Sequence, residues 1–334
     1  MKQNVLITGG AGFIGSHLVR EILKYDNLNP VVLDDLSGGF LENIPVGVDF
    51  IKGSINDTEL LKKLFEEYSF QYVYHLAAYA AEGLSHFIRK FNYENNLIGS
   101  INLINQSVIH KIKCFVFTSS IAVYGKGQVP MIETMTPIPE DPYGIAKYAV
   151  ELDLANAKHM FGLNYVVFRP HNVYGEYQNI GDKYRNVVGI FMNQILQGKP
   201  MSIFGNGFQQ RAFSYVGDIT PVIASCAWNT KTYGEVFNVG ADIPYTVKDL
   251  AHEVMDVMDQ AGHPINYTEE RNEVKIAYSD HQKVRTYFGD TQQTSLKEGL
   301  TRMAEWVKKT GVRQSKNFDN VEIMENLPSA WLKD

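Results

Sequence analysis

The stretch VLITGGAGFIGSHL, residues 5–18, decides the fold. It opens with an apolar run that has no polar face, which is typical of a strand buried on both sides. Gly9, Gly10, Gly12 and Gly15 follow, and an amphipathic helix pattern begins among them. Glycines in such a loop permit a tight turn and let a pyrophosphate approach the N–H groups at the helix N-terminus. Between a strand and a helix, this spacing predicts a dinucleotide site.

Strand and helix patterns alternate through the first half of the chain. Examples are the strand PVVLDD (30–35), the helix DTELLKKLFEEY (57–68) and the strand KCFVFTSS (113–120). This alternation indicates βαβ units and a parallel sheet. We therefore expect an α/β protein, with a Rossmann-type doubly wound parallel sheet and a smaller, mixed α/β lobe that binds substrate.

The pattern changes after NYVVFRP (164–170), where glycine, asparagine and tyrosine multiply. Thr246 and Asp249 predict a capped helix start within the second lobe. The chain after Gly311 is weakly patterned, so we expect it to be poorly ordered. The expected division is a cofactor-binding domain of residues 1–171 and about 212–240, a substrate lobe of about 172–211 and 241–312, and a C-terminal tail of 313–334.

Composition excludes several classes of protein. The 334 residues are 45% hydrophobic and carry a formal charge of -6 without basic runs, which argues against a nucleic-acid partner. Cys114 and Cys226 each lie among apolar residues, so we expect buried free thiols and a reducing compartment. The sequence has neither a signal-peptide pattern nor an apolar stretch long enough to span a bilayer. We expect a cytoplasmic protein with no membrane partner.

Asp34 ends the second strand pattern, about twenty residues after the glycines. A carboxylate there accepts hydrogen bonds from the adenosine ribose hydroxyls and repels a 2'-phosphate. The following LSGGF (36–40) offers no cation to a 2'-phosphate, so the sequence favours NAD over NADP. The alternative is an ordinary turn with a solvated aspartate.

The stretch PEDPYGIAKYAVE (139–151) places Tyr143 and Lys147 four residues apart at a predicted helix start, hence on one helix face. A free phenol has a pKa of about 10 and is a poor base at neutral pH. A nearby ammonium, and a positive nicotinamide, would lower that pKa and make a proton acceptor. Ser120, at the end of a buried strand, is placed to hold the same substrate hydroxyl.

These motifs together resemble one enzyme family. TGGAGFIG (8–15), HLAA (75–78), TSSIAVYG (118–125) and PYGIAKYAVE (142–151) are similar to those of the extended short-chain dehydrogenase/reductases, specifically the NAD-dependent nucleotide-sugar epimerase/dehydratase family. The resemblance runs from residue 3 to about residue 310 and is closest to UDP-hexose 4-epimerases. It implies that Tyr143 is the general base and acid.

The resemblance also implies the remaining roles. Lys147 would be the electrostatic partner of Tyr143 and a ribose ligand, and Ser120 would hold the reacting hydroxyl. The resemblance implies no metal. It does imply a homodimer, formed by helices near 93–111 and 143–161. The implied NAD-binding residues are Gly9, Gly12, Phe13, Ile14, Gly15, Asp34, Ser54, Ile55, Leu76, Ala77, Ala78, Asn95, Thr118, Ser119, Tyr143 and Lys147.

The residues after the serine distinguish reactions within the family. Dehydratases that resemble this chain carry an Asp-Glu pair there, whereas Ile121 and Ala122 have no proton to exchange. The sequence therefore favours 4-epimerisation of a UDP-hexose, UDP-N-acetylhexosamine or UDP-hexuronate through a transient 4-keto sugar. The alternatives are a nucleotide-sugar oxidoreductase or dehydratase, an epimerase at another carbon, and a non-catalytic NAD sensor.

Resemblance also implies the substrate contacts, and some positions depart from the family pattern. Ser54 stands where relatives usually have Asp, and His171 stands beside the expected sugar in place of an aromatic or aliphatic residue. Ala277 corresponds to a gate position, where a small residue would admit an N-acetylated sugar. Substrate contacts are implied for Ser120, Asn172, Asn186, Phe204, Arg211 and Arg271, and the roles of Glu82, His86 and Arg89 are left open.

Overall fold

The structure, a computed structural model, describes residues 2–127, 129–270, 274–290, 293–314, 318–328 and 331. A seven-stranded, all-parallel sheet forms its centre, with strand order β11-β6-β5-β4-β1-β2-β3. The strands are β1 (Gln3–Thr8), β2 (Leu28–Asp34), β3 (Asp49–Lys52), β4 (Tyr72–His75), β5 (Cys114–Thr118), β6 (Tyr165–Pro170) and β11 (Val236–Val239). The Rossmann-type fold predicted from the sequence is confirmed.

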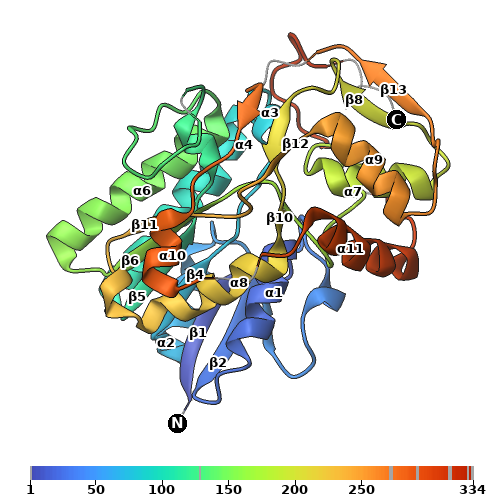
Figure 1. Cartoon of the computed structure of the whole chain (residues 1–334). Helices are drawn as coiled ribbons and strands as arrows, with labels where there is room; N and C mark the ends of the chain where they lie inside the picture. The colour runs from blue at the N-terminus through green and yellow to red at the C-terminus, as the bar shows by residue number, and fades with distance from the viewer. Residues whose placement is uncertain are drawn as a thin grey trace.

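Helices cover both faces of the sheet (Figure 1). Val5 and Ile7 of β1 face one apolar cluster, and Leu6 between them faces the other, as the two-residue period of a strand requires. The first face carries α1 (Phe13–Ile22) and α8 (Val216–Ser225), and the second carries α2 (Thr58–Tyr68), α5 (Gly99–Ile109) and α6 (Pro142–Phe161).

The helix that carries the predicted base begins where the sequence indicates. Asp141 is the N-cap of α6 and accepts a hydrogen bond from Gly144 N at 2.9 Å. Pro142 occupies the first turn, where its missing N–H costs nothing, and Gly162 ends the helix with a φ of 75°. These signals fix Tyr143 in the first turn of a 20-residue helix.

The helix expected near 93–111 begins earlier than predicted. A continuous helical run starts with α4 (Arg89–Tyr93), passes through a π-helical turn (Glu94–Ile98) and continues as α5. A short helix, α3 (Glu82–Ser85), precedes it. Four 3-10 helices complete the helical elements outside the second lobe: Leu41–Asn43, Ile121–Tyr124, Cys226–Trp228 and Thr230–Thr232.

The second lobe gathers three helices and short strands beside the carboxyl ends of the sheet (Figure 1). Its helices are α7 (Val187–Leu196), α9 (Val247–Val257) and α11 (Leu296–Thr310), while α10 (Gln282–Phe288) packs against β11. Its paired strands are β7 (Val173–Tyr174) with β10 (Ser214–Tyr215), β8 (Met201–Phe204) with β13 (Ile265–Thr268), and β9 (Gln210–Ala212) with β12 (Pro244–Thr246) and β14 (Ile276–Ala277).

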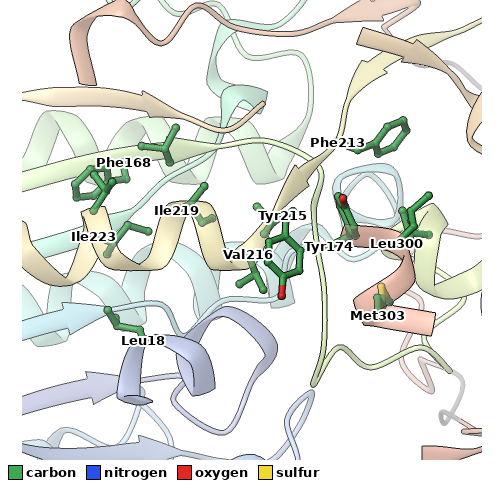
Figure 2. Packing of buried hydrophobic residues seen from close by; sticks show 14 of the residues in the cluster. Leu18, Phe168, Tyr174, Phe213, Tyr215, Val216, Ile219, Ile223, Leu300 and Met303 are labelled. Atoms are coloured by element: carbon green, nitrogen blue, oxygen red, sulfur yellow. The ribbon is translucent and has the colours of Figure 1, made fainter. Parts of the chain in front are cut away.

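One apolar core joins the lobe to the sheet. Figure 2 shows Ile219 and Ile223 of α8 near Phe168 of β6, and the packing continues through Tyr215 and Tyr174 to the lobe. There it reaches α11, which buries a stripe formed by Leu296, Leu300, Met303 and Val307. The lobe is therefore held to the sheet by the same continuous core.

Several smaller predictions can be checked in the fold. Thr246 and Asp249 form the expected capping box at the start of α9. Cys114 and Cys226 are free and fully buried, as expected. No helix in the part of the chain that the structure describes is long and apolar enough to cross a membrane. Poor order of the tail is wrong for its described part, because Trp331 is only 7% exposed and packs against Leu84 and Ile88.

Candidate active site

One large cleft opens at the carboxyl ends of the sheet strands and extends under the second lobe. Its volume is about 1230 Å³, larger than the roughly 300–1,000 Å³ of a typical small-molecule site. It therefore has room for two ligands side by side. The following predicted residues line it: Gly9, Gly12, Phe13, Ile14, Gly15, Asp34, Ser54, Ile55, Leu76, Ala77, Ala78, Asn95, Thr118, Ser119, Ser120, Tyr143, Lys147, Asn172, Asn186, Phe204 and Arg211. Arg271 lies outside the described residues.

The glycine loop has the geometry that its sequence predicts. Gly9 has a φ of +73°, in the left-handed region that favours glycine. A Cβ on Gly15 would lie 2.1 Å from the Gly9 carbonyl oxygen, so only glycine lets α1 approach the loop. Gly12 is the N-cap of α1 and has no side chain with which to cap it. The first-turn N–H groups of α1 thus face the cleft as an anion site.

Asp34 lies at the next strand end, only 8% exposed. Its carboxylate accepts hydrogen bonds from Ala11 N at 3.0 Å and Leu36 N at 2.8 Å, which fixes its direction relative to the glycine loop. Burial raises its pKa, and the two backbone donors act in the opposite direction. Across the cleft, the buried Thr118 Oγ1 has no hydrogen-bond partner. The anion site, the oriented carboxylate and the unsatisfied hydroxyl together fit a dinucleotide.

Tyr143, Lys147 and Ser120 meet at the floor of the cleft. The Ser120 side chain hydrogen-bonds the Tyr143 phenol, and Lys147 Nζ lies 5.8 Å from the centre of the Tyr143 ring. Lys147 Nζ also donates to the Thr118 carbonyl oxygen at 2.8 Å. The tyrosine is 7% exposed and the lysine 2%. The i, i+4 spacing therefore brings both groups to one face, as the sequence predicts.

Burial acts against ionisation of either group. It raises the pKa of Tyr143, and the Ser120 hydrogen bond only partly opposes this. It lowers the pKa of Lys147 to about 7, although the carboxylate of Glu151 acts in the opposite direction. Of the two positive charges that the sequence argument invokes, the ammonium of Lys147 is therefore not sufficient by itself. A further positive charge is needed in the cleft before the phenolate is favoured.

A buried ion pair holds the helix that carries Tyr143 and Lys147 against the sheet. Arg169 on β6 donates two hydrogen bonds to Glu151 of α6, at 3.0 and 2.5 Å. Ser119 Oγ donates to the same carboxylate at 2.5 Å. The Ser119 hydroxyl is used in this hydrogen bond to Glu151. Ser119 therefore lines the cleft chiefly with its other atoms. The pair ties the catalytic helix to the strands whose ends form the site.

The predicted substrate residues of the second lobe are partly engaged with the protein itself. Asn172 donates to the Ala212 carbonyl oxygen at 3.3 Å. Asn186 caps α7 by accepting from Val188 N at 3.3 Å and also donates to the Val173 carbonyl oxygen. The Arg211 guanidinium donates to backbone carbonyl oxygens of Gln210, Lys275 and Val274. Their side chains line the cleft, and their contacts with substrate remain predictions.

Sequence reasoning missed Arg185, which lies between the two halves of the cleft. Its guanidinium pairs with Asp182 at 2.6 Å and lies 4.9 Å from the centre of the Tyr79 ring. A Cβ on Gly38 would lie 3.1 Å from Arg185 Nη2, so the arginine reaches the loop after β2. The stretch LSGGF itself contains no cation, but the Arg185 guanidinium lies beside this loop in the folded chain. No local motif marks Arg185, because the contacts that bring it to the cleft, with Tyr79 and Gly38, join it to residues more than 100 positions away.

Two further polar side chains were also missed. Gln178 Oε1 and Asn179 Oδ1 are buried, line the cleft and have no hydrogen-bond partner in the structure. Buried acceptors of this kind are costly unless a ligand or water satisfies them. They follow the turn after β7, a segment without a recognisable pattern.

His171, left open by the sequence, is part of a buried histidine pair. Its Nε2 lies 3.1 Å from Nε2 of His281, and its Nδ1 lies 3.0 Å from the Ala212 carbonyl oxygen. His281 Nδ1 in turn lies 2.6 Å from Asp242. Burial lowers the pKa of His171 to about 3, with His281 acting in the same direction. The pair joins the end of β6 to the second lobe.

Comparison with known proteins agrees with this geometry. Residues 5–240 match the model of the NAD dependent epimerase/dehydratase family. A putative UDP-glucose 4-epimerase of Methanocaldococcus jannaschii is 32% identical over 308 residues, which cover 91% of this chain and 98% of the relative.

Two solved structures are similarly close in fold. UDP-glucose 4-epimerase of Thermotoga maritima with UDP-glucose is 34% identical, with a TM-score of 0.86, and covers 92% of this chain and 99% of its own. UDP-N-acetylglucosamine 4-epimerase of Methanobrevibacter ruminantium, in complex with UDP-N-acetylmuramic acid, is 30% identical, with a TM-score of 0.85, and covers 93% of this chain and 100% of its own.

Proposed function

Because the chain belongs to the NAD dependent epimerase/dehydratase family, we propose that it is a nucleotide-sugar epimerase. The reaction inverts C4 of a UDP-linked hexose, N-acetylhexosamine or hexuronate through a transient 4-keto sugar. One observation carries this proposal. Tyr143, Lys147 and Ser120 meet at the cleft floor, while the adjacent Ile121 and Ala122 carry no group that exchanges a proton.

Tyr143 moves the proton in both half-reactions. Its phenolate oxygen accepts the proton of the sugar hydroxyl, which Ser120 holds by a hydrogen bond. NAD, which the glycine loop and Asp34 would hold, would supply the hydride acceptor for the sugar carbon and the hydride donor to the opposite face of the ketose. The alcohol thus loses one proton and one hydride to become a ketone, and Tyr143 gives the proton back as the hydride returns. Proton transfer therefore needs no group beyond Tyr143, Lys147 and Ser120.

Lys147 stabilises the phenolate electrostatically. With a pKa of about 7, the lysine is poised near half protonation at neutral pH. A negative charge on Tyr143, whose ring centre lies 5.8 Å from Nζ, favours the ammonium form, and the ammonium favours the phenolate. The two groups therefore ionise together once the positive ring of the cofactor lies beside them.

The second lobe would hold the nucleotide. We propose that Asn172 and Asn186 contact the sugar and diphosphate, that Phe204 borders the base, and that Arg211 pairs with a phosphate, to which a guanidinium can donate two parallel hydrogen bonds. In support, all four residues line the cleft. Arg271 is proposed for the same role on sequence grounds. Residues 1–171 and about 212–240 would then bind NAD, and about 172–211 and 241–312 would bind the nucleotide sugar.

We also propose a homodimer, and exposed apolar side chains on two adjacent helical runs support it. Ile145, Leu152 and Met160 of α6 are 40%, 55% and 59% exposed. On the neighbouring run, Ile98 and Ile109 are 51% and 64% exposed. Such side chains along two packed helices suit pairing with a second copy. We also propose a cytoplasmic location, which the two free thiols favour.

A panel of UDP-, GDP- and CDP-sugars, incubated with purified protein without added cofactor and analysed by NMR, tests the proposal. A C4 epimer of a UDP-sugar is the expected product. An accumulating keto sugar would indicate an oxidoreductase or dehydratase, and inversion elsewhere would indicate another epimerase. Cofactor binding without any turnover would indicate an NAD sensor.

A further inference from the structure

The end of the chain lies against the sugar side of the cleft. We define the C-terminal segment as residues 318–328 with Trp331. Ile323, Leu327 and Trp331 line the cleft together with Tyr79 and Phe87 of the loop after β4. Trp331 is 7% exposed and packs over Ala81, Leu84 and Ile88, which are nearly fully buried. The C-terminal segment is thus one wall of the cleft.

Glu322 ties this segment to the start of a helix. Its two carboxylate oxygens accept hydrogen bonds from Lys90 N and Phe91 N, each at 2.8 Å. These N–H groups belong to the first turn of α4, where no intrahelical acceptor is available. Glu322 N and Ile323 N also donate to the Phe87 carbonyl oxygen, at 2.8 and 3.2 Å. A residue some 230 positions away therefore caps the helical run that starts at Arg89.

Aromatic contacts add to the same attachment. The ring of Phe318 lies 5.3 Å from Tyr79 and 5.0 Å from Phe91, centre to centre. The ring of Trp331 lies 5.4 Å from Tyr184 and 6.2 Å from Phe87. The attached segment of the chain is therefore residues 79–92, which includes α3 and the start of α4.

Residues 79–92 in turn touch the first turn of α6. Ser85 Oγ accepts from Tyr143 N at 3.3 Å, and Asn92 Nδ2 donates to the Pro142 carbonyl oxygen at 2.8 Å. Tyr143 N is a first-turn amide, so this contact supplies a partner that the helix itself cannot. The contacts form an unbroken path from Glu322 through residues 79–92 to the backbone of Tyr143.

We infer that the C-terminal segment completes the active site, with Glu322 as a positioning residue that holds the Tyr143 phenol in place through residues 79–92. This inference rests on the proposed function, because Tyr143 is taken as the proton-transfer group. A displacement of about 1 Å at a reacting group can cost about 100-fold in rate, so a support of this kind affects turnover. Glu322 itself is not among the residues that line the cleft.

The variant Glu322→Ala removes both acceptors, and because Glu322 is exposed the protein should still fold. Hydrogen exchange of the backbone amides reports the path without any substrate. We expect amides of residues 89–93, and also those in 142–146 apart from Pro142, which has no N–H, to exchange about tenfold faster than in the wild type. Asp319→Ala is the matched control, since it removes an exposed carboxylate from the same segment, and it should leave both regions unchanged.

Turnover supplies the second measurement. For the UDP-sugar that the wild type converts, kcat of Glu322→Ala should fall about three- to tenfold while KM stays within about twofold, because positioning acts on the chemical step. Glu322→Gln keeps one acceptor oxygen and should give an intermediate kcat. Bound NAD and Tm should stay close to those of the wild type.

Each result decides the inference. Faster exchange at residues 89–93 without a change at 142–146 or in kcat would reduce Glu322 to a local cap and overturn it. Unchanged exchange in both regions would mean that the attachment does not hold in solution, which also overturns it. If the wild type converts no UDP-sugar, the proposed function fails, and exchange at 142–146 still decides the positioning role.

Discussion

The two ends of the cleft are built in different ways. At the cofactor end, several contributing residues stand where strands of the sheet end: Gly9 directly follows β1, and Asp34 and Thr118 are the last residues of β2 and β5. At the sugar end, the wall is made where segments distant in sequence meet, such as residues 79–92, Arg185 and the C-terminal segment. The cofactor end is fixed by the strands of the sheet, and we call it the frame. The residues of the sugar end, which we call the variable end, can differ between relatives without disturbing the sheet. This difference suits a family whose members share NAD and differ in the nucleotide sugar on which they act.

Replacement of the phenol tests the frame most severely. Tyr143→Phe removes the proton-transfer group and should lower kcat by about 100- to 10,000-fold for every substrate, with normal NAD binding. Steady-state kinetics with two different UDP-sugars measures this, and Tyr148→Phe on the same helix is the control. A loss of kcat confined to one sugar would mean that Tyr143 affects substrate preference like a residue of the variable end. That result would contradict the contrast between the two ends.

The ion pair beneath the cofactor end should matter next most. Glu151→Gln leaves the buried Arg169 without its counter-charge, which should lower the free energy of unfolding by about 3 to 5 kcal/mol. Urea unfolding of the purified protein measures the change. Asp153→Asn, a partly exposed carboxylate on the same helix, is the matched control and should change stability by less than about 1 kcal/mol.

Lys147 should give the frame a distinctive pH dependence. Its pKa of about 7 in the folded protein lies below the value of about 10.4 in the unfolded chain. The unfolded chain therefore binds more protons between these values, so the free energy of unfolding rises with pH across that range.

Lys147→Met removes this titration. In protein freed of cofactor, the variant should be more stable than the wild type by about 4 to 5 kcal/mol below pH 7, and the difference should vanish as pH approaches about 10. Urea unfolding at a series of pH values checks this. A difference that stays constant with pH would contradict a lowered lysine pKa.

The smallest effect should appear at the sugar end and should depend on the substrate. Ala277 lines the cleft with only 7% of its surface exposed. Ala277→Tyr should lower kcat/KM for UDP-N-acetylglucosamine about tenfold relative to UDP-glucose, because the added ring narrows the pocket. Equal losses for both sugars would mean that the position does not sort substrates, and a strong wild-type preference for the smaller sugar would exclude a pocket for N-acetylated sugars.

Sequence reasoning succeeded where a backbone requirement fixes the residue type. Gly15 must be glycine because a Cβ would collide with the Gly9 carbonyl oxygen, and Asp141 and Pro142 mark the helix start that places Tyr143. The parallel sheet follows from apolar strands alternating with helices. Each of these signals lies within a few residues along the chain, so it can be recognised before the fold is known.

The remainder depended on contacts between distant segments. Arg185 reaches Gly38 and Tyr79, and Glu322 caps a helix that starts at Arg89. Neither side chain differs in type or spacing from an ordinary surface residue. The balance of charge between Tyr143 and Lys147 was also beyond the sequence, because burial decides it and burial is a property of the folded chain.

The continuous core described for Figure 2 has a consequence for protein engineering. A graft that exchanged residues 172–211 and 241–312 for those of a relative would separate Tyr215 from α11, whose Arg302 guanidinium lies 5.4 Å from the centre of the Tyr215 ring. Chimaeras that alter sugar preference should therefore keep Tyr215 and α11 together, and exchange only the loops around residues 79–92 and the C-terminal segment.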